Sequence, residues 1–336
     1  MKAYEIQHTF GIDSLALAER PQPQPGPEQV LVRVRAASLN FHDLAIVLGI
    51  YDPHLPLPLV PLSDGAGEVV AVGDAVSRVK VGDRVAGLFT QKWLAGDLTA
   101  ETVDTTLGGP YDGVLQEYIV LPEDGVVKIP EHMTYEEAST LPIAALTAWS
   151  ALFVQGDLKA GQTVLLQGTG GVSLFALQFA RLAGARVIVI SSSNEKLERV
   201  RALGADELIN YREVPDWPAK ARELTNGKGV DLLVDVTGNL QQSVKAVAVM
   251  RQISMVGFLG QTAVQIENII PILQGNIRLQ GVNTGHRESF EAMNMAIAQH
   301  RLRPVIDRIF PFEEAVEAFR FMQSGKYFGK ICIRLP

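Results

Sequence analysis

Apolar and polar residues alternate with a period of two in the first third of the chain. Residues 30–36 place valines on one face and two arginines on the other, and segments 68–72 and 79–85 continue the pattern. Glycines at 73 and 82 stand where turns are needed. This period predicts half-buried β-strands joined by turns. Residues 91–112 are polar with little periodicity, and we predict a long loop there.

From about residue 163 the pattern changes to short apolar runs that alternate with helical segments. The predicted strands span 163–167, 186–190, 207–210, 230–236, 252–257 and 277–282. The predicted helices span 171–183, 195–203, 217–225, 239–249 and 263–274. Regular alternation of this kind predicts an α/β fold, with a mostly parallel, doubly wound sheet covered by helices on both faces.

The tail departs from this alternation. It holds one amphipathic helix over 312–324 and a final strand over 330–334, which is more like the strands of the first domain. We therefore predict a first domain over 1–124 that is completed by 304–336, and a second domain over 125–303. The helical stretch 135–154 is expected to connect the two, and 336 residues are enough for two cores.

The most informative motif lies at residues 163–173. An apolar strand runs into Gly168, Thr169, Gly170 and Gly171, and a helix follows from Val172. Glycines at a strand-to-helix junction allow a tight turn and let the backbone approach a pyrophosphate, which the helix N-terminus then binds. Because the flanking strands and helix supply the context that the motif requires, we predict a Rossmann dinucleotide-binding domain.

The end of the next strand indicates which dinucleotide binds. Strands that bind NAD usually end in Asp or Glu, but this strand ends in Ser191 and Ser192, with Lys196 soon after. Hydroxyls and an ammonium suit a 2′-phosphate, so NADP is favoured, with NAD as the alternative. The serines can also cap the following helix, and the two roles are compatible.

Composition and charge narrow the class of partner. Hydrophobic residues make up 47% of the chain, charged residues make up 20%, and the formal net charge is −7. This balance argues against nucleic acid or an anionic membrane. No signal-peptide core or uninterrupted membrane-length apolar run is evident, and the single cysteine, Cys332, excludes a multi-cysteine zinc site. We expect a cytoplasmic protein that acts on a small molecule.

Several short segments together resemble the medium-chain dehydrogenase/reductase superfamily, over nearly the whole chain. They are ASLNFHD at 37–43, DGAGEV at 64–69, GDRV at 82–85, LTAW at 146–149, the glycine motif, ALGAD at 202–206 and GKYFGK at 325–330. The resemblance implies a GroES-like, β-rich catalytic domain, split in sequence, beside the Rossmann domain. It also implies a homodimer or homotetramer, with strand 277–282 at a sheet edge that many members pair across a dimer axis.

The departures from the zinc-dependent members of that family are equally informative. Those members place a cysteine where this chain has Asn40 and a His-Glu pair where it has Ser63 and Asp64, and region 88–112 lacks their four cysteines. A catalytic zinc needs three ligands and an open position. His42 and His54 leave an improvised site as the alternative, but the chain looks like the zinc-independent, quinone oxidoreductase-like branch.

The absence of zinc ligands bears on the substrate. Zinc would polarise a carbonyl and stabilise the developing alkoxide. Quinones and enones delocalise the incoming charge, so they need less of this help. We predict an NADPH-dependent oxidoreductase that transfers hydride to a quinone, an enone or a related carbonyl. The alternatives are a zinc-free NADP-dependent alcohol dehydrogenase or carbonyl reductase, and a crystallin-like protein that binds NADPH without catalysis.

The resemblance also implies individual roles. Asn40 would lie beside the nicotinamide ribose and substrate, and the alternative role is a helix cap. Tyr51 is a candidate for a different reason: it lies in an expected cleft-lining loop, where it would donate a hydrogen bond to a substrate oxygen, with simple packing as the alternative. Lys196 and Lys330 are candidate phosphate partners or surface charges. The remaining predicted cofactor contacts are Thr147, Tyr211, Thr237, Gly238, Gly257, Phe258 and Asn283, most of which follow predicted strands.

Overall fold

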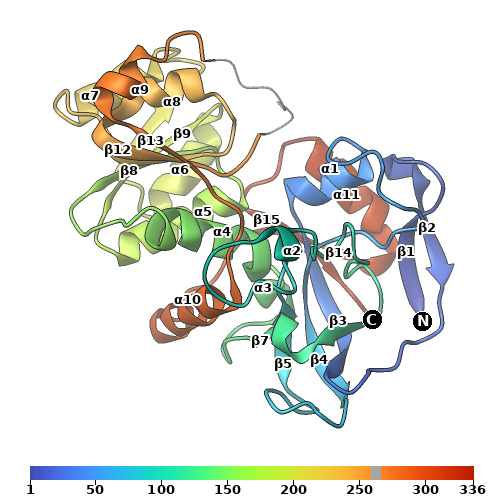
Figure 1. The fold of residues 1–336 in the computed structure, drawn as a ribbon. Coiled ribbons are helices and arrows are strands. Elements are labelled where there is room, and N and C mark those ends of the chain that lie inside the picture. The colour runs from blue at the N-terminus through green and yellow to red at the C-terminus, as the bar shows by residue number, and fades with distance from the viewer. Residues whose placement is uncertain (259–265) are drawn as a thin grey trace. The chain divides into compact units, whose positions relative to one another are not determined.

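The computed structural model describes residues 1–258 and 266–336, which fold as two compact units. Unit 1 comprises Met1–Leu146 and Thr284–Pro336, and unit 2 comprises Thr147–Asn283. The colours of Figure 1 show that unit 1 combines the blue N-terminal part of the chain with its red C-terminal end. The chain therefore leaves unit 1 once and returns to it, as an inserted second unit requires.

Unit 1 is built on a mixed sheet in the order β14-β15-β3-β4-β5-β7, with β6 also paired to β3. Its strands include valine-rich β3, whose buried valines form a core with three phenylalanines of the tail, Phe310, Phe312 and Phe319. The strands of this sheet are β3 (Gln29–Leu39), β4 (Asp64–Val72), β5 (Arg84–Gly87), β6 (Tyr118–Pro122), β7 (Val126–Lys128), β14 (Ile306–Pro311) and β15 (Lys330–Arg334). A separate two-stranded sheet pairs β1 (Lys2–Ile6) with β2 (Leu15–Glu19).

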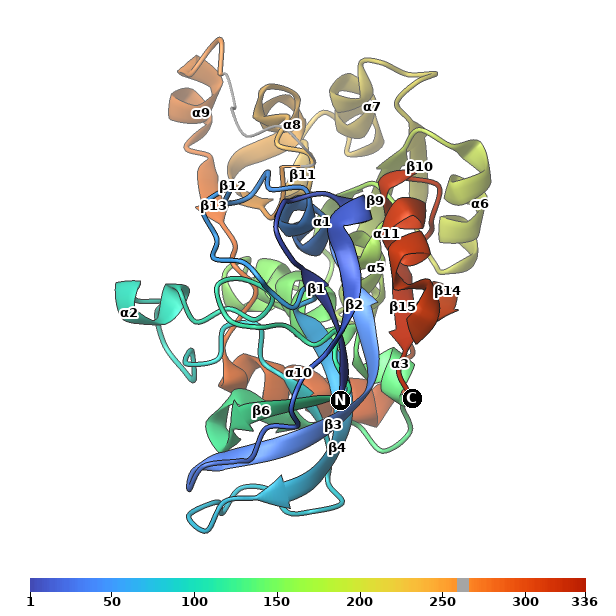
Figure 2. The same cartoon turned by 90° about the vertical axis from the view of Figure 1, so that its right-hand side faces the viewer.

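Helices close one side of this core. Helix α11 (Ala315–Gln323) packs on β15 and on α1 (Phe41–Val47), which begins directly after β3 (Figures 1 and 2). The other helices of unit 1 are α2 (Ala100–Val103), α3 (Tyr135–Ala138) and α10 (Arg287–His300). The amphipathic tail helix and final strand thus lie in unit 1, where the sequence places them.

Unit 2 is a six-stranded parallel sheet in the order β10-β9-β8-β11-β12-β13. The chain order reverses between β8 and β11, so this sheet is doubly wound. The strands are β8 (Thr163–Gln167), β9 (Arg186–Ser191), β10 (Glu207–Asn210), β11 (Val230–Asp235), β12 (Val247–Met255) and β13 (Arg278–Gly281). The helices are α5 (Gly171–Leu182), α6 (Asn194–Ala202), α7 (Trp217–Leu224), α8 (Leu240–Ala246) and α9 (Ile270–Gly275). The α/β prediction and its parallel sheet are confirmed.

Most element boundaries of unit 2 lie within one residue of the prediction, and the largest differences are at α8, β12 and α9. Helix α8 stops at Ala246 and β12 starts at Val247, whereas the sequence pattern predicted helix to 249 and a strand from 252. The β-branched valines at 247 and 249 favour extended backbone, which local periodicity underweights. Part of the helix predicted over 263–274 lies outside the described residues; α9 starts at Ile270, with Pro271 in its first turn.

The unit boundaries also lie elsewhere than predicted. The positions 124/125 and 303/304 both fall inside unit 1. Strand β7 pairs with β5, and α10 packs against β7, where the Asn294 side-chain amide donates to the Lys128 carbonyl at 3.0 Å. These contacts join segments that are far apart in the sequence, so no change in local composition marks the true unit boundaries.

The connecting segment Tyr135–Val154 is apolar and long enough to cross a membrane by length and composition alone. In the structure 78% of its apolar window is buried. It includes two π-helical turns, Leu141–Ala145 and Ser150–Val154, on either side of α4 (Leu146–Trp149). Burial within the protein accounts for its apolar composition.

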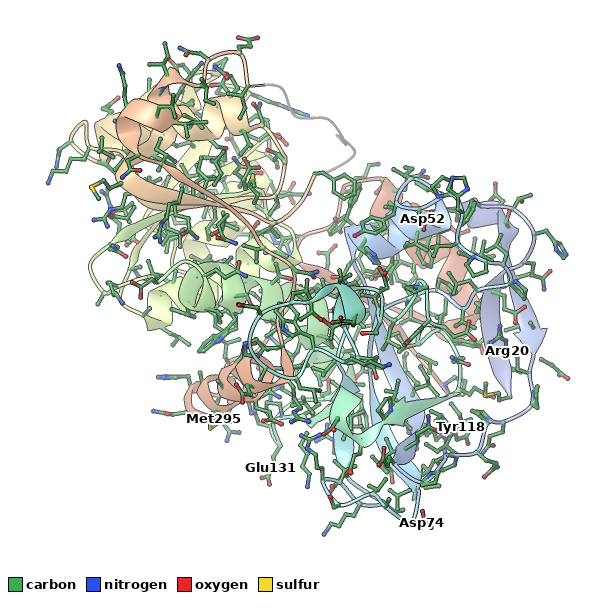
Figure 3. The ribbon with its side chains drawn as sticks, in the orientation of Figure 1. Arg20, Asp52, Asp74, Tyr118, Glu131 and Met295 are labelled. Carbon is green, nitrogen blue, oxygen red and sulfur yellow. The ribbon has the colours of Figure 1, made fainter. Side chains whose placement is uncertain are left out.

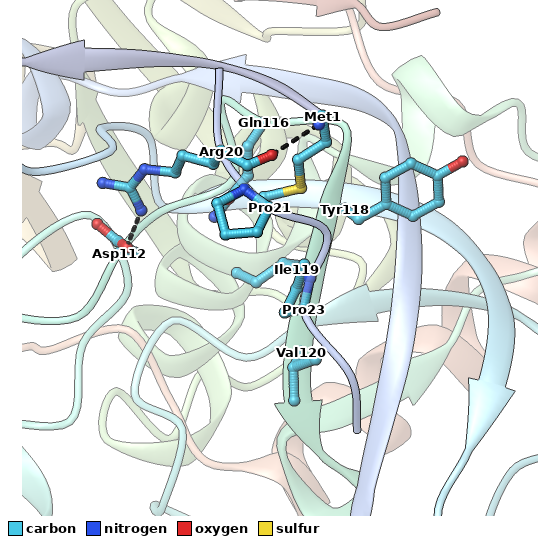
Figure 4. A pocket seen from close by; sticks show the side chains of 9 residues that line it. All are labelled: Met1, Arg20, Pro21, Pro23, Asp112, Gln116, Tyr118, Ile119 and Val120. Carbon is cyan, nitrogen blue, oxygen red and sulfur yellow. Dashed lines mark hydrogen bonds and ion pairs between the residues drawn. The ribbon is translucent and has the colours of Figure 1, made fainter. Parts of the chain in front are cut away.

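A shallow pocket of about 470 Å³ opens on unit 1 near the N-terminus (Figure 4). The Met1 ammonium donates to the Arg20 carbonyl, and the Arg20 guanidinium pairs with Asp112. Arg20 and Tyr118, which line it, are also labelled in Figure 3. None of the predicted site residues lines this pocket, so it is separate from the candidate site.

Candidate functional site

The glycine loop of unit 2 joins β8 to the N-terminus of α5. Gly168 has a φ of +75°, which L side chains rarely adopt, and its N–H donates to the Ile190 carbonyl at 2.7 Å. Gly170 caps α5 without a side chain. A methyl group added at either glycine would meet no atom within 4 Å. The loop is therefore open above its backbone, and the first N–H groups of α5 are presented to an anion.

A buried carboxylate shapes the neighbouring turn, at the switch point of the sheet. Asp235 ends β11 and is fully buried; its Oδ1 accepts the N–H groups of Thr237 and Gly238, each at 2.9 Å. Its Oδ2 accepts the Ser243 hydroxyl at 2.7 Å. The Thr237 hydroxyl donates to Gln167 at 3.0 Å, which ties the end of β11 to the end of β8. This network holds Thr237 and Gly238 at the edge where ligands bind in doubly wound sheets.

Sequence reasoning missed Asp235, Gln167 and Ser243 as supports of the site. A signal for Asp235 was present, since an acidic residue ends an otherwise apolar strand directly before Thr237 and Gly238. A buried carboxylate must find donors, and the N–H groups of the next turn are the nearest in sequence. Gln167 and Ser243 meet only through the fold.

The predicted ribose and adenosine contacts lie together at the ends of β9 and β10. Ser191 ends β9 and is buried, and its carbonyl accepts the Tyr211 N–H at 3.1 Å. The hydroxyl of Ser193 accepts the Lys196 N–H at 3.3 Å, so the cap that the sequence allowed is formed by Ser193. Ser192 and the side chain of Lys196 stay partly exposed. No carboxylate occupies positions 191–193, the usual place for a ribose-binding acid.

The remaining predicted contacts of unit 2 lie further along the sheet. Gly257 and Phe258 follow β12, and a methyl group added at Gly257 would lie 2.9 Å from the Val236 carbonyl oxygen. That close approach explains why glycine stands there. Asn283 follows β13 and is the last residue of unit 2. Thr147 is buried on α4 rather than at a strand end, and its role as a nicotinamide contact stays a prediction.

Unit 1 brings together three polar side chains from distant parts of the sequence. Asn40 links β3 to α1, Asp64 begins β4 and Lys330 begins β15. The antiparallel register sets Ser38 opposite Asp64 and Leu39 opposite Ile331. Strand pairing therefore delivers the carboxylate and the ammonium to the same end of β3.

These three side chains form a buried, hydrogen-bonded group, which we call the Lys330 cluster. The Lys330 ammonium donates to Asn40 Oδ1 at 2.6 Å and to the Leu39 carbonyl at 2.8 Å, and lies 3.6 Å from Asp64 Oδ2. Asn40 Nδ2 donates to Asp64 Oδ2 at 2.8 Å, and the Ser38 hydroxyl approaches the same oxygen at 3.4 Å. The residues Asn40, Asp64 and Lys330 are 8%, 0% and 3% exposed.

A second carboxylate fixes the backbone around this cluster. Asp43 lies in the first turn of α1 and is 1% exposed. It accepts the Asn40 N–H at 2.7 Å, and from Ser63 both the N–H at 2.9 Å and the hydroxyl at 2.8 Å. Asn40 is thus the cap of α1 as well as a member of the cluster. Its place beside the nicotinamide ribose and substrate stays a prediction.

The second oxygen of Asp64, Oδ1, is buried and has no hydrogen-bond partner among the described residues. Burial raises the pKa of Asp64 to about 7, and the nearby charge of Asp43 adds to this effect. Lys330, Asn40 and Ser38 act in the opposite direction. The cluster therefore holds a carboxyl group that changes protonation state near neutral pH.

Tyr51 packs on the aromatic surface beside α1. Its ring centroid lies 4.6 Å from that of His42, which also contacts Phe89 at 5.2 Å, both edge to face. Burial lowers the pKa of His42, and its Nδ1 has no hydrogen-bond partner in the described part of the chain. Tyr51 itself is 56% exposed. The packing role is therefore observed, and the substrate role of Tyr51 stays a prediction.

The phosphate role predicted for Lys330 does not fit the structure. Its ammonium is enclosed, with two acceptors and one carboxylate within 4 Å. A phosphate contact would require these internal partners to be abandoned in a buried environment. Lys330 begins β15, which lies between β14 and β3, and a short GKYFGK motif does not reveal this position.

The ligands that these residues offer do not fit a catalytic zinc. In place of thiolate and imidazole ligands they offer an amide, a hydroxyl and one carboxylate, from Asn40, Ser63 and Asp64, with the Lys330 ammonium beside them. Burial raises the pKa of the Cys332 thiol to about 12, which disfavours a thiolate ligand. Across residues 1–258 and 266–336, no three His, Cys, Asp or Glu side chains gather as a metal-ligand group.

Comparison with known proteins agrees with this architecture. The profile described as the alcohol dehydrogenase GroES-like domain matches residues 26–131, and that described as zinc-binding dehydrogenase matches residues 171–299. A zinc-type alcohol dehydrogenase-like protein of Schizosaccharomyces pombe is 42% identical over 324 residues, covering 94% of this chain and 93% of its own.

Two solved structures extend the comparison. An NAD-dependent alcohol dehydrogenase is 33% identical with a TM-score of 0.90, covering 100% of both chains. A quinone oxidoreductase of Pseudomonas syringae is 28% identical with a TM-score of 0.83, covering 99% of both. The fold and its dinucleotide edge define an NAD(P)H-dependent oxidoreductase. The chain belongs to the medium-chain dehydrogenase/reductase superfamily, with quinone oxidoreductase-like and alcohol dehydrogenase-like relatives.

The open glycine loop predicts a variant that loses cofactor and keeps its fold. Gly170 has ordinary backbone angles and open space beyond its Cα, so the unfolding temperature of Gly170→Leu should lie within a few degrees of that of the wild type. Its side chain would fill the anion cradle and weaken dinucleotide binding by about tenfold or more. Gly170→Ala should have an intermediate effect. Fluorescence titration with the dinucleotide measures both, and unchanged affinity in Gly170→Leu would contradict this site.

The raised pKa of Asp64 predicts a pH dependence of stability. Unfolded aspartate titrates near pH 4, so between about pH 4 and 7 the native state binds a proton that the unfolded state lacks. Stability should therefore fall as pH rises through this window and level off above it, by roughly 4 kcal/mol at most. The reference is Asp64→Asn/Lys330→Met, which leaves neither charge unpaired. Urea unfolding from pH 5 to 8 measures the difference, and parallel curves for the two proteins would refute it.

Proposed function

We propose that this protein is an NADPH-dependent reductase that transfers hydride to a quinone, an enone or a related carbonyl without a catalytic zinc. The observation that carries this proposal is the Lys330 cluster. At the positions where zinc-dependent relatives are expected to hold their metal, Asn40 and Asp64 instead bind an internal ammonium. The side chains of this site supply no Lewis acid of their own.

This arrangement favours acceptors that delocalise negative charge. NADPH, when bound, supplies the hydride. A simple aldehyde would then develop a localised alkoxide, and a single side-chain donor such as Asn40 stabilises it far less than a metal does. A quinone becomes a hydroquinone anion and an enone becomes an enolate, each with charge spread over several atoms. The likeness to a quinone oxidoreductase supports this acceptor class.

Residues at the edge of unit 2 are suited to hold the dinucleotide. The open loop at Gly168 and Gly170 fits a pyrophosphate, and Thr237 and Gly238 lie at the adjoining switch point. Serines in place of an acid at the end of β9, with Lys196 in the next helix, support NADP. The likeness to an NAD-dependent alcohol dehydrogenase at 33% identity favours NAD instead, so activity with NADH must be measured beside activity with NADPH.

A zinc-free alcohol dehydrogenase or carbonyl reductase with NADP is the second candidate. The 42% identity to a zinc-type alcohol dehydrogenase-like protein favours it. It shares the fold and the cofactor edge, and differs only in the acceptor. The two candidates are separated by which carbonyl compounds accept hydride.

The acceptor preference is tested by NADPH oxidation at 340 nm with chelator-treated protein. We expect turnover of quinones or enones and little turnover of simple aldehydes, with rates unchanged by the chelator. Added zinc serves as the control and should not increase the rate. Aldehyde turnover equal to that of quinones would favour the second candidate, and loss of activity on chelation would contradict a metal-independent reaction.

The cofactor preference is tested at Lys196. Removing its ammonium should weaken NADPH binding through the 2′-phosphate, so Lys196→Ala should raise KM for NADPH by about tenfold and leave KM for NADH within about twofold. Arg201→Ala removes a positive charge from the far end of the same helix and is the matched control. Equal changes for both cofactors in Lys196→Ala would argue against a 2′-phosphate contact.

A further inference from the structure

The Lys330 cluster leaves the Asn40 side chain with one defined orientation. Its oxygen accepts from the Lys330 ammonium at 2.6 Å, and one hydrogen of Nδ2 is donated to Asp64 at 2.8 Å. An amide that faced the other way would point its NH₂ group at an ammonium and its oxygen at a carboxylate. Both contacts would then be repulsive, so the two charged partners select a single amide orientation.

Lys330 also fixes the backbone that carries Asn40. Its ammonium donates to the carbonyl of Leu39, the last residue of β3, at 2.8 Å. Asp43 holds the Asn40 N–H from the opposite side at 2.7 Å. The junction between β3 and α1 is therefore held at the carbonyl before Asn40 and at its own N–H. Lys330 makes the first of these two contacts and Asp43 makes the second.

We propose that Lys330 is a positioning residue for the proposed reductase site: it orients the Asn40 amide so that Asn40 presents a hydrogen-bond donor and no acceptor. The Asn40 side chain accepts from the Lys330 ammonium and, in the capping box of α1, faces the Asp43 N–H, while one Nδ2 hydrogen is donated to Asp64. The second Nδ2 hydrogen is therefore the polar atom that Asn40 can still offer to a ligand. A donor suits an acceptor oxygen that gains negative charge during hydride transfer. This inference rests on the proposed function for its catalytic part.

The alternative is that Lys330 serves only to neutralise Asp64. The two roles differ in what a compensating substitution restores. Lys330→Met leaves Asp64 without its counter-charge, so both roles predict a loss of stability. In Lys330→Met/Asp64→Asn no charge is left unpaired, and both roles predict that stability recovers. Only the positioning role predicts that kcat stays low in this double variant, because the anchor of the Asn40 oxygen is still missing.

The decisive experiment is a double-mutant cycle between Asn40→Ala and Lys330→Met, measured on kcat with a quinone and saturating NADPH. We expect Asn40→Ala to lower kcat by about tenfold or more in the wild type and by less than about twofold in the Lys330→Met background. The comparison uses kcat at saturating NADPH, so that a change in KM for the cofactor, beside which Asn40 is expected to lie, does not enter it. Equal losses in both backgrounds, or full recovery of kcat in Lys330→Met/Asp64→Asn, would overturn the inference.

A second measurement does not depend on turnover. The side-chain amide of Asn40 in ¹⁵N-labelled protein can be assigned by its disappearance in Asn40→Asp. We expect slow hydrogen exchange in the wild type and exchange at least about tenfold faster in Lys330→Met/Asp64→Asn, at matched thermal stability. Unchanged exchange would refute the positioning role. A wild-type protein that reduces no acceptor but shows the expected exchange would count against the proposed function and leave the positioning of Asn40 intact.

Discussion

The buried ammonium of Lys330 is the constraint on which the architecture of unit 1 depends. A charged group in a protein interior is tolerated only when opposite charge and hydrogen-bond acceptors surround it. Here Asp64 supplies the charge, and Asn40 and the Leu39 carbonyl supply the acceptors. Three strands, β3, β4 and β15, must pair in register for these groups to meet. The strand order that places β3 between β4 and β15 is therefore also what assembles the Lys330 cluster.

The predicted dinucleotide edge of unit 2 also depends on a buried charged group, the carboxylate of Asp235. Asp235 is as deeply buried as Asp64, but backbone N–H groups and a hydroxyl occupy both of its oxygens. A fully satisfied carboxylate fixes a turn through these donors. Asp64 keeps one oxygen without a partner in the part of the chain that the structure describes. Burial raises the pKa of Asp64 to about 7. The two buried aspartates therefore differ in how many of their oxygens accept hydrogen bonds: both oxygens of Asp235 do, and only Oδ2 of Asp64 does among the described residues.

Much of the fold was predictable from local patterns. The strands β8, β10 and β15 have the predicted bounds, since short apolar runs between turn residues carry their own signal. The glycine loop was found because its chemistry is local in sequence. The Lys330 cluster was not, because Lys330 meets Asn40 across 290 positions and only through strand pairing. From the sequence, Lys330 was predicted to be a phosphate partner or a surface charge, and its place in the GKYFGK motif did not reveal these internal partners.

The origin of Lys330 in β15 also determines when unit 1 can be completed. Chains fold progressively as they emerge from the ribosome, with N-terminal parts available first. Asp64 is made early, while its counter-charge follows only after the whole of unit 2. Through most of synthesis, the end of β3 therefore has no Lys330 to close it, and unit 2 is complete before unit 1. Strand β15 is therefore the last strand to pair with β3, and Asp64 stays hydrated in the nascent chain until β15 brings Lys330 to it.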